Sequence, residues 1–264
     1  MKWRKPLKSI FNSFFKKTAP TPAINPYLPD GLRVYCIGDI HGRYDLLCQL
    51  HDKITEDVET FLGQKVIIYL GDFIDRGLHS KDVIDCLSKQ TNAGVEYIYL
   101  RGNHEQTLLD FLQEDSVGRS WLTYGGQATL ASYGVSIAKI PTKREDFIEL
   151  QAQLRKNLPE AHYKFLVATR LSHQLGNYFF VHAGINPQLP LHKQNSEDML
   201  WIRDAFTETT KSFEKIIVHG HTVTEHAELL ANRIGIDTGA YASSVLTCLV
   251  LEGATQALIQ TKAS

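Results

Sequence analysis

Cysteine is scarce in this chain, and long hydrophobic runs are missing from it. The four cysteines are scattered without a CxxC pair, so the sequence offers no disulfide framework. Cys36 and Cys248 fall inside apolar runs, where we expect buried free thiols in a reducing, cytoplasmic environment. No apolar stretch approaches the roughly 18 residues of a transmembrane helix. We therefore expect a soluble protein without disulfides.

A large excess of charge of either sign is also missing. The net charge of -1 argues against nucleic acid as a partner, because nucleic-acid-binding domains are usually strongly basic. The basic charge gathers at the start of the chain, since residues 1–17 hold six Lys or Arg and no acidic residue. The remaining residues therefore carry a net charge of -7.

Residues 1–30 read as a basic amphipathic segment followed by a proline-rich linker. Trp3, Leu7, Phe11 and Phe14 recur at helical spacing among lysines. Such a helix can lie peripherally on an anionic inner membrane surface or contact a partner. A frayed tail, or a helix packed on its own domain, is the alternative interpretation, and the sequence leaves both open.

Residues 31–264 form one α/β domain in our interpretation, and we expect a monomer. Short apolar runs at 34–37, 66–70 and 96–100 alternate with helical patterns at 46–61 and 81–90. Alternation of strands and helices predicts parallel strands joined by helical crossovers. Polar residues follow each strand, at the sheet edge where α/β folds gather their ligands.

The sequence pattern in the second half of the domain predicts a helical insertion and a further sheet. Residues 106–176 look mainly helical and read as a cap inserted beside the site. Strands resume at 178–181, and four more at 216–218, 233–236, 246–251 and 257–260 suggest a second, more antiparallel sheet. A central β-sandwich flanked by helices, α/β with an α+β-like character, fits this order.

Five short blocks rich in His, Asp and Asn carry the chemistry of the chain. Each is flanked by glycine, and several directly follow a predicted strand. Any one of them alone is a weak signal, whereas five in this order indicate an enzyme. The blocks are Gly38-Asp-Ile-His-Gly42, Gly71-Asp-Phe-Ile-Asp-Arg-Gly77, Gly102-Asn-His-Glu105, His182-Ala-Gly184 and His219-Gly-His-Thr222.

Six side chains of these blocks form a predicted two-metal centre. Asp39 and His41 stand two apart on an extended segment, so both point to one side and can bind one ion. The Asp72 carboxylate can bridge two ions. The second ion would be completed by Asn103, His182 and His221. A nitrogen and oxygen set without thiolate favours Mn, with Fe or Zn as alternatives.

The remaining polar residues of the blocks fit phosphate hydrolysis. Two ions about 3.5–4 Å apart would hold a hydroxide for in-line attack on phosphorus. His104 is the expected general acid for the leaving oxygen, and Asp75 can fix its tautomer. Arg76 can hold two phosphate oxygens. Phosphate contacts are expected from Arg76, Asn103 and Arg203.

Two residues of the blocks have a competing interpretation. His219 precedes His221 by two residues, and we favour His221 as the ligand. Glu105 is expected to be structural, paired with a neighbouring arginine. A single Asp after a strand is usually a turn or helix-capping residue, and only the joint occurrence of the six ligands favours a metal site.

The blocks GDIHG, GDFIDRG, GNHE, HAG and GHT resemble the phosphoprotein phosphatase branch of the metallophosphoesterases, in its bacterial and phage-type form. The resemblance runs from about Arg33 to Gly253 and includes the segments 121–134 and 235–241. It implies a β-sandwich, a dinuclear site often active with manganese, and phosphomonoester hydrolysis. It also gives the six ligands, His104 and Arg76 the roles stated above. Other metallophosphoesterases often have a second histidine where this chain has Val223. The absence of that histidine is similar to the phosphoprotein phosphatase branch.

Three functions follow as hypotheses. The first is a protein serine/threonine phosphatase, with phosphotyrosine as a further substrate class. The second is a dinucleoside polyphosphate hydrolase such as a diadenosine tetraphosphatase, since a related branch shares the metal core. That branch tends to carry Asp after GNH, so Glu105 favours a phosphoprotein or phosphopeptide substrate. A non-catalytic scaffold is the third, and the complete ligand set argues against it.

Overall fold

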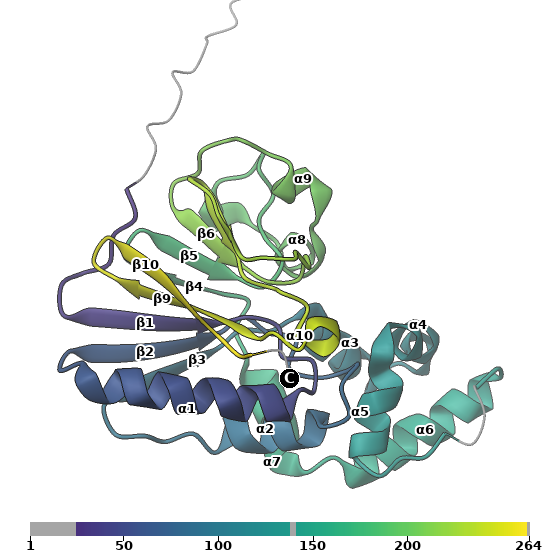
Figure 1. Ribbon diagram of the computed structural model, residues 1–264. Helices are drawn as coiled ribbons and strands as arrows, with labels where there is room; N and C mark the ends of the chain where they lie inside the picture. The colour runs from purple at the N-terminus through teal and green to yellow at the C-terminus, as the bar shows by residue number, and fades with distance from the viewer. Residues whose placement is uncertain (1–24, 138–140, 263–264) are drawn as a thin grey trace, which may run out of the picture.

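Two β-sheets pack face to face in the computed structural model, which describes residues 25–137 and 141–262 (Figure 1). Helices cover the outer faces, so the predicted β-sandwich flanked by helices is confirmed. The first sheet contains β1 (Leu32–Ile37), β2 (Gln64–Tyr69), β3 (Val95–Tyr99), β9 (Thr247–Glu252) and β10 (Thr255–Gln260). The second contains β4 (Ser172–Leu175), β5 (Tyr178–Val181), β6 (Ile216–His219), β7 (Glu228–Leu229) and β8 (Arg233–Gly235).

The parallel part of the first sheet follows the predicted alternation. β1 pairs in parallel with β2, and β2 with β3. The crossovers are α1 (Tyr44–Thr60) and α2 (Ser80–Ser88). Leu46, Leu50 and Ile54 recur at helical spacing on α1 and are buried, so this face packs on the sheet.

The last two strands correct the sequence-based topology. β9 pairs antiparallel with β1, and β10 pairs antiparallel with β9, so both belong to the first sheet. The second sheet has the order β4-β5-β6-β8-β7, and its central strands β5, β6 and β8 are parallel. Residues on both faces of β9 are buried, so it fits beside the buried β1. Local spacing shows a strand but not its partner, because the partner is distant in the sequence.

The buried apolar side chains belong to three clusters, and neighbouring side chains of one strand can belong to different clusters. Val34 of β1 and Phe180 of β5 lie in the cluster between the sheets. Tyr35 of β1 faces the helices on the outer side of the first sheet, and Phe179 of β5 faces the outer side of the second. Because successive side chains of a strand point to opposite faces, β1 and β5 each contribute to two cores. Both sheets are therefore fixed by burial on two sides.

The remaining helices lie after the third strand and around the second sheet. Residues 106–176 hold helices as far as Ala168 and then β4, and their role as a cap stays a prediction. These helices are α3 (Asn103–Phe111), α4 (Gly118–Trp121), α5 (Gln127–Ser132), α6 (Arg144–Asn157), α7 (Glu160–Ala168), α8 (Ser196–Trp201), α9 (Asp204–Thr207) and α10 (Ala240–Ser243). A π-helical turn, Leu122–Gly126, joins α4 to α5.

The two predictions about membranes concern different parts of the chain. The predicted amphipathic helix falls at residues 1–17, which lie outside the described residues. Among the helices that the structure describes, none has the length and apolar character needed to cross a bilayer.

Candidate metal centre

The loops that follow five strands bring the six predicted ligands together. In each sheet the parallel strands end at one edge, and the two edges meet: the His221 N–H donates to Asp39 Oδ2 at 3.0 Å, and His182 Nδ1 donates to the Leu70 carbonyl at 2.9 Å. All six side chains are buried. They are Asp39 and His41 after β1, Asp72 after β2, Asn103 at the start of α3, His182 after β5 and His221 after β6.

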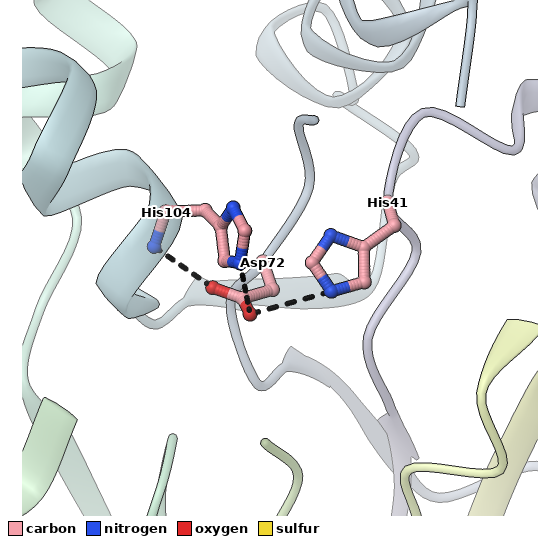
Figure 2. Close-up of side chains that lie close together, drawn as sticks. All are labelled: His41, Asp72 and His104. Carbon is pink, nitrogen blue, oxygen red and sulfur yellow. Dashed lines mark hydrogen bonds and ion pairs between the residues drawn. The ribbon is translucent and has the colours of Figure 1, made fainter. Parts of the chain in front are cut away.

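Asp72 occupies the middle of this cluster. Its Oδ2 lies 3.5 Å from His41 Nε2, and its Oδ1 lies 3.4 Å from His182 Nε2. The ligand atoms form two groups, and within each group all atoms lie within 4.8 Å of one another. The first group is His41, Asp72 and His104, and the second is Asp72, His182 and His221. Figure 2 shows the first group, with the Asp72 carboxylate between the two imidazoles. A carboxylate shared by two groups is the geometry expected of a residue that bridges two ions.

Left-handed backbone conformations concentrate in the ligand loops. Positive φ angles occur at His41 (47°), Asp72 (51°), Asp75 (71°), Arg76 (66°) and His221 (63°). This region costs a residue other than glycine about 1–3 kcal/mol, so it persists only where the surroundings impose it. Five such residues in the predicted site indicate that the fold holds these side chains in position at a cost in stability.

Burial keeps the ligand histidines neutral. Burial lowers the pKa of His41 to about 3 despite the nearby Asp72 carboxylate, and it lowers the pKa of His182 as well. His41 Nδ1 donates to the Ile74 carbonyl at 2.9 Å, which leaves Nε2 with its lone pair toward Asp72. A neutral imidazole whose other nitrogen is held by a carbonyl is the form that binds a metal.

Two buried polar atoms of the ligand set lack a hydrogen-bond partner among the described residues. They are Asp39 Oδ1 and His221 Nε2. A buried polar atom without a partner costs about 1–3 kcal/mol, so it needs a compensating contact. Burial raises the pKa of Asp39, and the Asp237 and Asp72 carboxyls raise it further, as expected of acids that lack a counter-charge. The residues therefore fit divalent cations.

His104 is held by Asp75 beside the cluster. Its Nδ1 donates to Asp75 Oδ2 at 2.6 Å, and its Nε2 lies 3.8 Å from Asp72 Oδ2. Burial lowers the pKa of His104, but the Asp72 and Asp75 carboxylates outweigh it and raise that pKa to about 9. A protonated imidazole carries a donor toward the cluster. This separates His104 from the neutral histidines.

The three predicted phosphate-binding residues lie around the cluster. Arg76 Nη2 lies 3.5 Å from His104 Nε2, and its guanidinium stacks 4.3 Å above the Tyr241 ring. Arg203 Nη1 donates to the His221 carbonyl at 3.2 Å. Asn103 Oδ1 lies 2.9 Å from His182 Nε2. The structure thus places one cationic side chain beside each group of ligand atoms.

Several residues of the site have a role that sequence reasoning missed. Asp75 accepts hydrogen bonds from Trp121 Nε1 at 2.9 Å and Thr129 Oγ1 at 2.6 Å, so the 118–132 helices fix the partner of His104. Asp237 is buried beside Asp39, and its burial raises its pKa to about 6. Trp121, Thr129 and Asp237 occur in the motif segments 121–134 and 235–241, and these segments are the sequence signal that points to them.

The structure shows the surroundings of the two ambiguous residues. His221 joins the second group, whereas His219 donates through Nδ1 to the Gly220 carbonyl and packs edge-on to Phe206. Glu105 is structural, but it pairs with no arginine among the described residues. Its carboxylate accepts backbone N–H groups instead, from Gly102 and from residues 72–74.

Comparison with known proteins identifies the family of this chain and several of its relatives. The sequence matches the calcineurin-like phosphoesterase family over residues 32–243. The asymmetrical bis(5'-nucleosyl)-tetraphosphatase of Halalkalibacterium halodurans is 26% identical over 81% of this chain and 87% of that protein. Serine/threonine-protein phosphatase 2 of Escherichia coli (strain K12) is 26% identical over 81% of this chain and 90% of that protein.

A solved structure shares the fold. The cold-active protein-tyrosine phosphatase of a Shewanella species superposes with a TM-score of 0.58 at 19% identity, covering 94% of this chain and 86% of that one. Because the family match spans most of the chain, the protein is a hydrolase of phosphate esters and belongs to the calcineurin-like phosphoesterase family.

Proposed function

We propose that this phosphoesterase is a protein phosphatase that hydrolyses phosphoserine and phosphothreonine, with phosphotyrosine as a further substrate. The observation that carries the proposal is the position of His104, a buried imidazole whose Nδ1 donates to Asp75 Oδ2 at 2.6 Å and whose Nε2 lies beside the ligand cluster, 3.8 Å from Asp72 Oδ2. A proton donor at this point serves a reaction whose leaving oxygen is strongly basic.

The leaving group distinguishes the candidate substrates. Serine and threonine leave phosphorus as alkoxides, which need a proton as the bond to phosphorus breaks. A nucleotide leaves from a polyphosphate as a weakly basic phosphate, which needs none. The His104 Nε2–H faces the cluster while Asp75 holds Nδ1, so the proton can pass from Nε2 to an ester oxygen. The geometry therefore supports a phosphomonoester of an alcohol.

The family uses divalent metal ions, and we propose manganese for this chain because its ligand set combines carboxylate, amide and imidazole. One ion would be held by Asp39, His41 and Asp72, and the other by Asp72, Asn103, His182 and His221. Two such ions supply Lewis acidity and an activated water when they are bound. In this proposal Arg76 and Arg203 neutralise and orient the phosphate oxygens.

A second candidate is a dinucleoside tetraphosphatase, which is favoured by the relatives that carry this name. The tetraphosphatase of Halalkalibacterium halodurans matches the same share of the chain at the same identity as the serine/threonine phosphatase of Escherichia coli. Relatives at this identity leave both substrates open, and the position of His104 beside the cluster, suited to a strongly basic leaving oxygen, supports the phosphoprotein.

Turnover of matched substrates tests the proposal. We would measure kcat/KM of the Mn2+-loaded enzyme on phosphoserine, phosphothreonine and phosphotyrosine peptides beside diadenosine tetraphosphate. We expect the phosphoserine and phosphothreonine peptides to be hydrolysed faster than the dinucleotide. A preference for the dinucleotide by more than a few fold would overturn the proposal.

A further inference from the structure

Five exposed apolar side chains lie on the segments that carry or contact the site residues. Large apolar side chains scattered over a surface are ordinary, but a group around one site marks an interaction surface. We call the five the apolar rim: Leu78 (71% exposed), Tyr124 (56%), Val223 (49%), Tyr241 (40%) and Trp201 (37%).

Two aromatic rings of the rim touch the two ligand groups directly. The Trp201 ring lies 6.5 Å from the His221 ring, nearly perpendicular to it, and the Tyr241 ring lies 5.5 Å from the His41 ring in a similar orientation. His221 belongs to the second group of ligand atoms and His41 to the first. One aromatic ring of the rim therefore lies beside each group of ligand atoms.

The other three rim residues connect the rings around the site. Val223 Cγ1 lies 2.9 Å from the position that a Cβ on Gly239 would take, next to the turn that carries Tyr241. On the other side Tyr241 stacks on Arg76, and Leu78 follows Arg76 by two residues. Tyr124 directly precedes Gly125, whose carbonyl accepts the Arg76 N–H at 3.2 Å. Val223 is thus linked to the segment of Tyr241, and the chain segments of Leu78 and Tyr124 meet at Arg76.

The Trp201 side of the rim is rigidly attached. Trp201 ends α8, whose Met199 and Leu200 are buried. The Ala183 N–H donates to the Met199 carbonyl at 2.9 Å, which ties this helix end to the loop of His182. A fixed exposed ring loses little conformational entropy when it contacts a substrate.

The charges around the site fit one phosphate on an apolar carrier. Two arginines act on the ligand candidates, Arg76 on Asp39 and His41, and Arg203 on His182 and His221. Arg43, near α10, is already paired with Asp45 at 2.7 Å. Two guanidinium groups that form no ion pair with a carboxylate among the described residues, next to exposed apolar side chains, suit a phosphorylated residue whose neighbours in the polypeptide are apolar.

We propose that the apolar rim selects phosphopeptides with apolar side chains flanking the phosphorylated residue, a preference that rests on the proposed protein phosphatase function. Trp201 and Val223 contact the flanking side chains on one side of the site, and Leu78 and Tyr124 contact those on the other. The rim residues are specificity-determining and leave the chemistry to His104 and the ligand set.

A pair of phosphothreonine peptides tests the rim. The two peptides are identical except that the residues flanking phosphothreonine are leucine in one and asparagine, of similar size, in the other. We expect the Mn2+-loaded enzyme to favour the leucine peptide in kcat/KM by about fivefold, the effect of partly burying one leucine side chain. Trp201→Ala and Val223→Asn should each reduce this ratio below about twofold.

The ratio separates the possible failures. A variant that folds poorly loses activity on both peptides in proportion, so its ratio stays at the wild-type value. Tyr163→Ala is the matched control, because Tyr163 is 43% exposed on α7 and lies outside the rim, and it should keep the wild-type ratio. Equal turnover of both peptides by the wild type, or an unchanged ratio in both rim variants, would overturn the rim inference alone. Failure to hydrolyse either peptide would overturn the protein phosphatase function.

Discussion

Glu105 offers a quantitative test of how the fold holds the central ligand Asp72. Its Oε2 accepts the N–H groups of Asp72 at 2.8 Å and Gly102 at 2.9 Å. Its Oε1 accepts those of Phe73 at 2.8 Å and Ile74 at 3.3 Å. The side chain is completely buried. One carboxylate therefore satisfies four backbone donors, three in the loop that carries Asp72 and one at Gly102.

Glutamine at this position conserves size but not hydrogen bonding. In Glu105→Gln one oxygen becomes an NH2 group, which faces two N–H donors and can accept from neither. Each buried donor left without an acceptor costs about 1–3 kcal/mol, so we expect Glu105→Gln to lower the free energy of unfolding by about 3 kcal/mol. Glu105→Ala removes all four acceptor contacts and should cost at least about 4 kcal/mol.

Urea unfolding of metal-free protein in EDTA measures these losses without a contribution from metal binding. Glu225→Gln is the matched control, since its side chain is 91% exposed, and it should change stability by less than about 0.5 kcal/mol. Mn2+ affinity, measured by calorimetry on the folded protein, should fall in Glu105→Gln because the Asp72 loop is less well fixed. A Glu105→Gln loss below about 1 kcal/mol would refute the hydrogen-bond argument.

Two further predictions concern histidines. His104→Asn should bind Mn2+ normally by calorimetry yet lose about 10²–10⁴-fold in kcat on a phosphoserine peptide, with a much smaller loss on p-nitrophenyl phosphate, whose leaving group needs no proton; normal hydrolysis of the peptide would disprove the general-acid role. Burial lowers the pKa of His51 to about 4, so the unfolded chain takes up its proton first as pH falls below about 6.5. The contribution of His51 to stability, up to about 3 kcal/mol, should be complete above pH 6.5 and disappear toward pH 4, and urea unfolding of wild type and His51→Gln at pH 7, 6 and 5 should show the difference shifting with pH. Parallel stability curves of the two proteins would contradict this.

Much of the fold could be predicted because the strands carry strong local signals. Val34 and Tyr178 begin predicted runs that coincide with buried strands, since alternating or continuous apolar residues must be buried on one or both faces. The pairing of the last strands could not be predicted. β9 reads as a strand in any sheet, and its place beside β1 depends on pairing between residues such as Ile37 and Cys248, far apart in the sequence.

The candidate site divides in the same way. Asp39, Asp72 and His221 were recognisable because each follows a strand in a glycine-flanked block. The contacts that support them were not, because Trp121 and Thr129 reach Asp75 from a separate helical segment. Glu105 shows the limit most clearly, since its neighbour in the sequence is His104 but its function is to hold a different loop.

The amino-acid sequence by itself determined which chemical groups this protein possesses and that they follow its strands, because apolar periodicity and glycine-flanked polar blocks are local properties. It therefore determined the α/β class, the phosphoesterase family and the set of candidate ligands. Only the tertiary structure decided that Asp72 is shared by two groups, that Asp75 is bound by Trp121 and Thr129, and that two exposed aromatic rings lie beside ligand histidines. These depend on strand pairing and on left-handed backbone at five site residues, which long-range packing imposes against local preference.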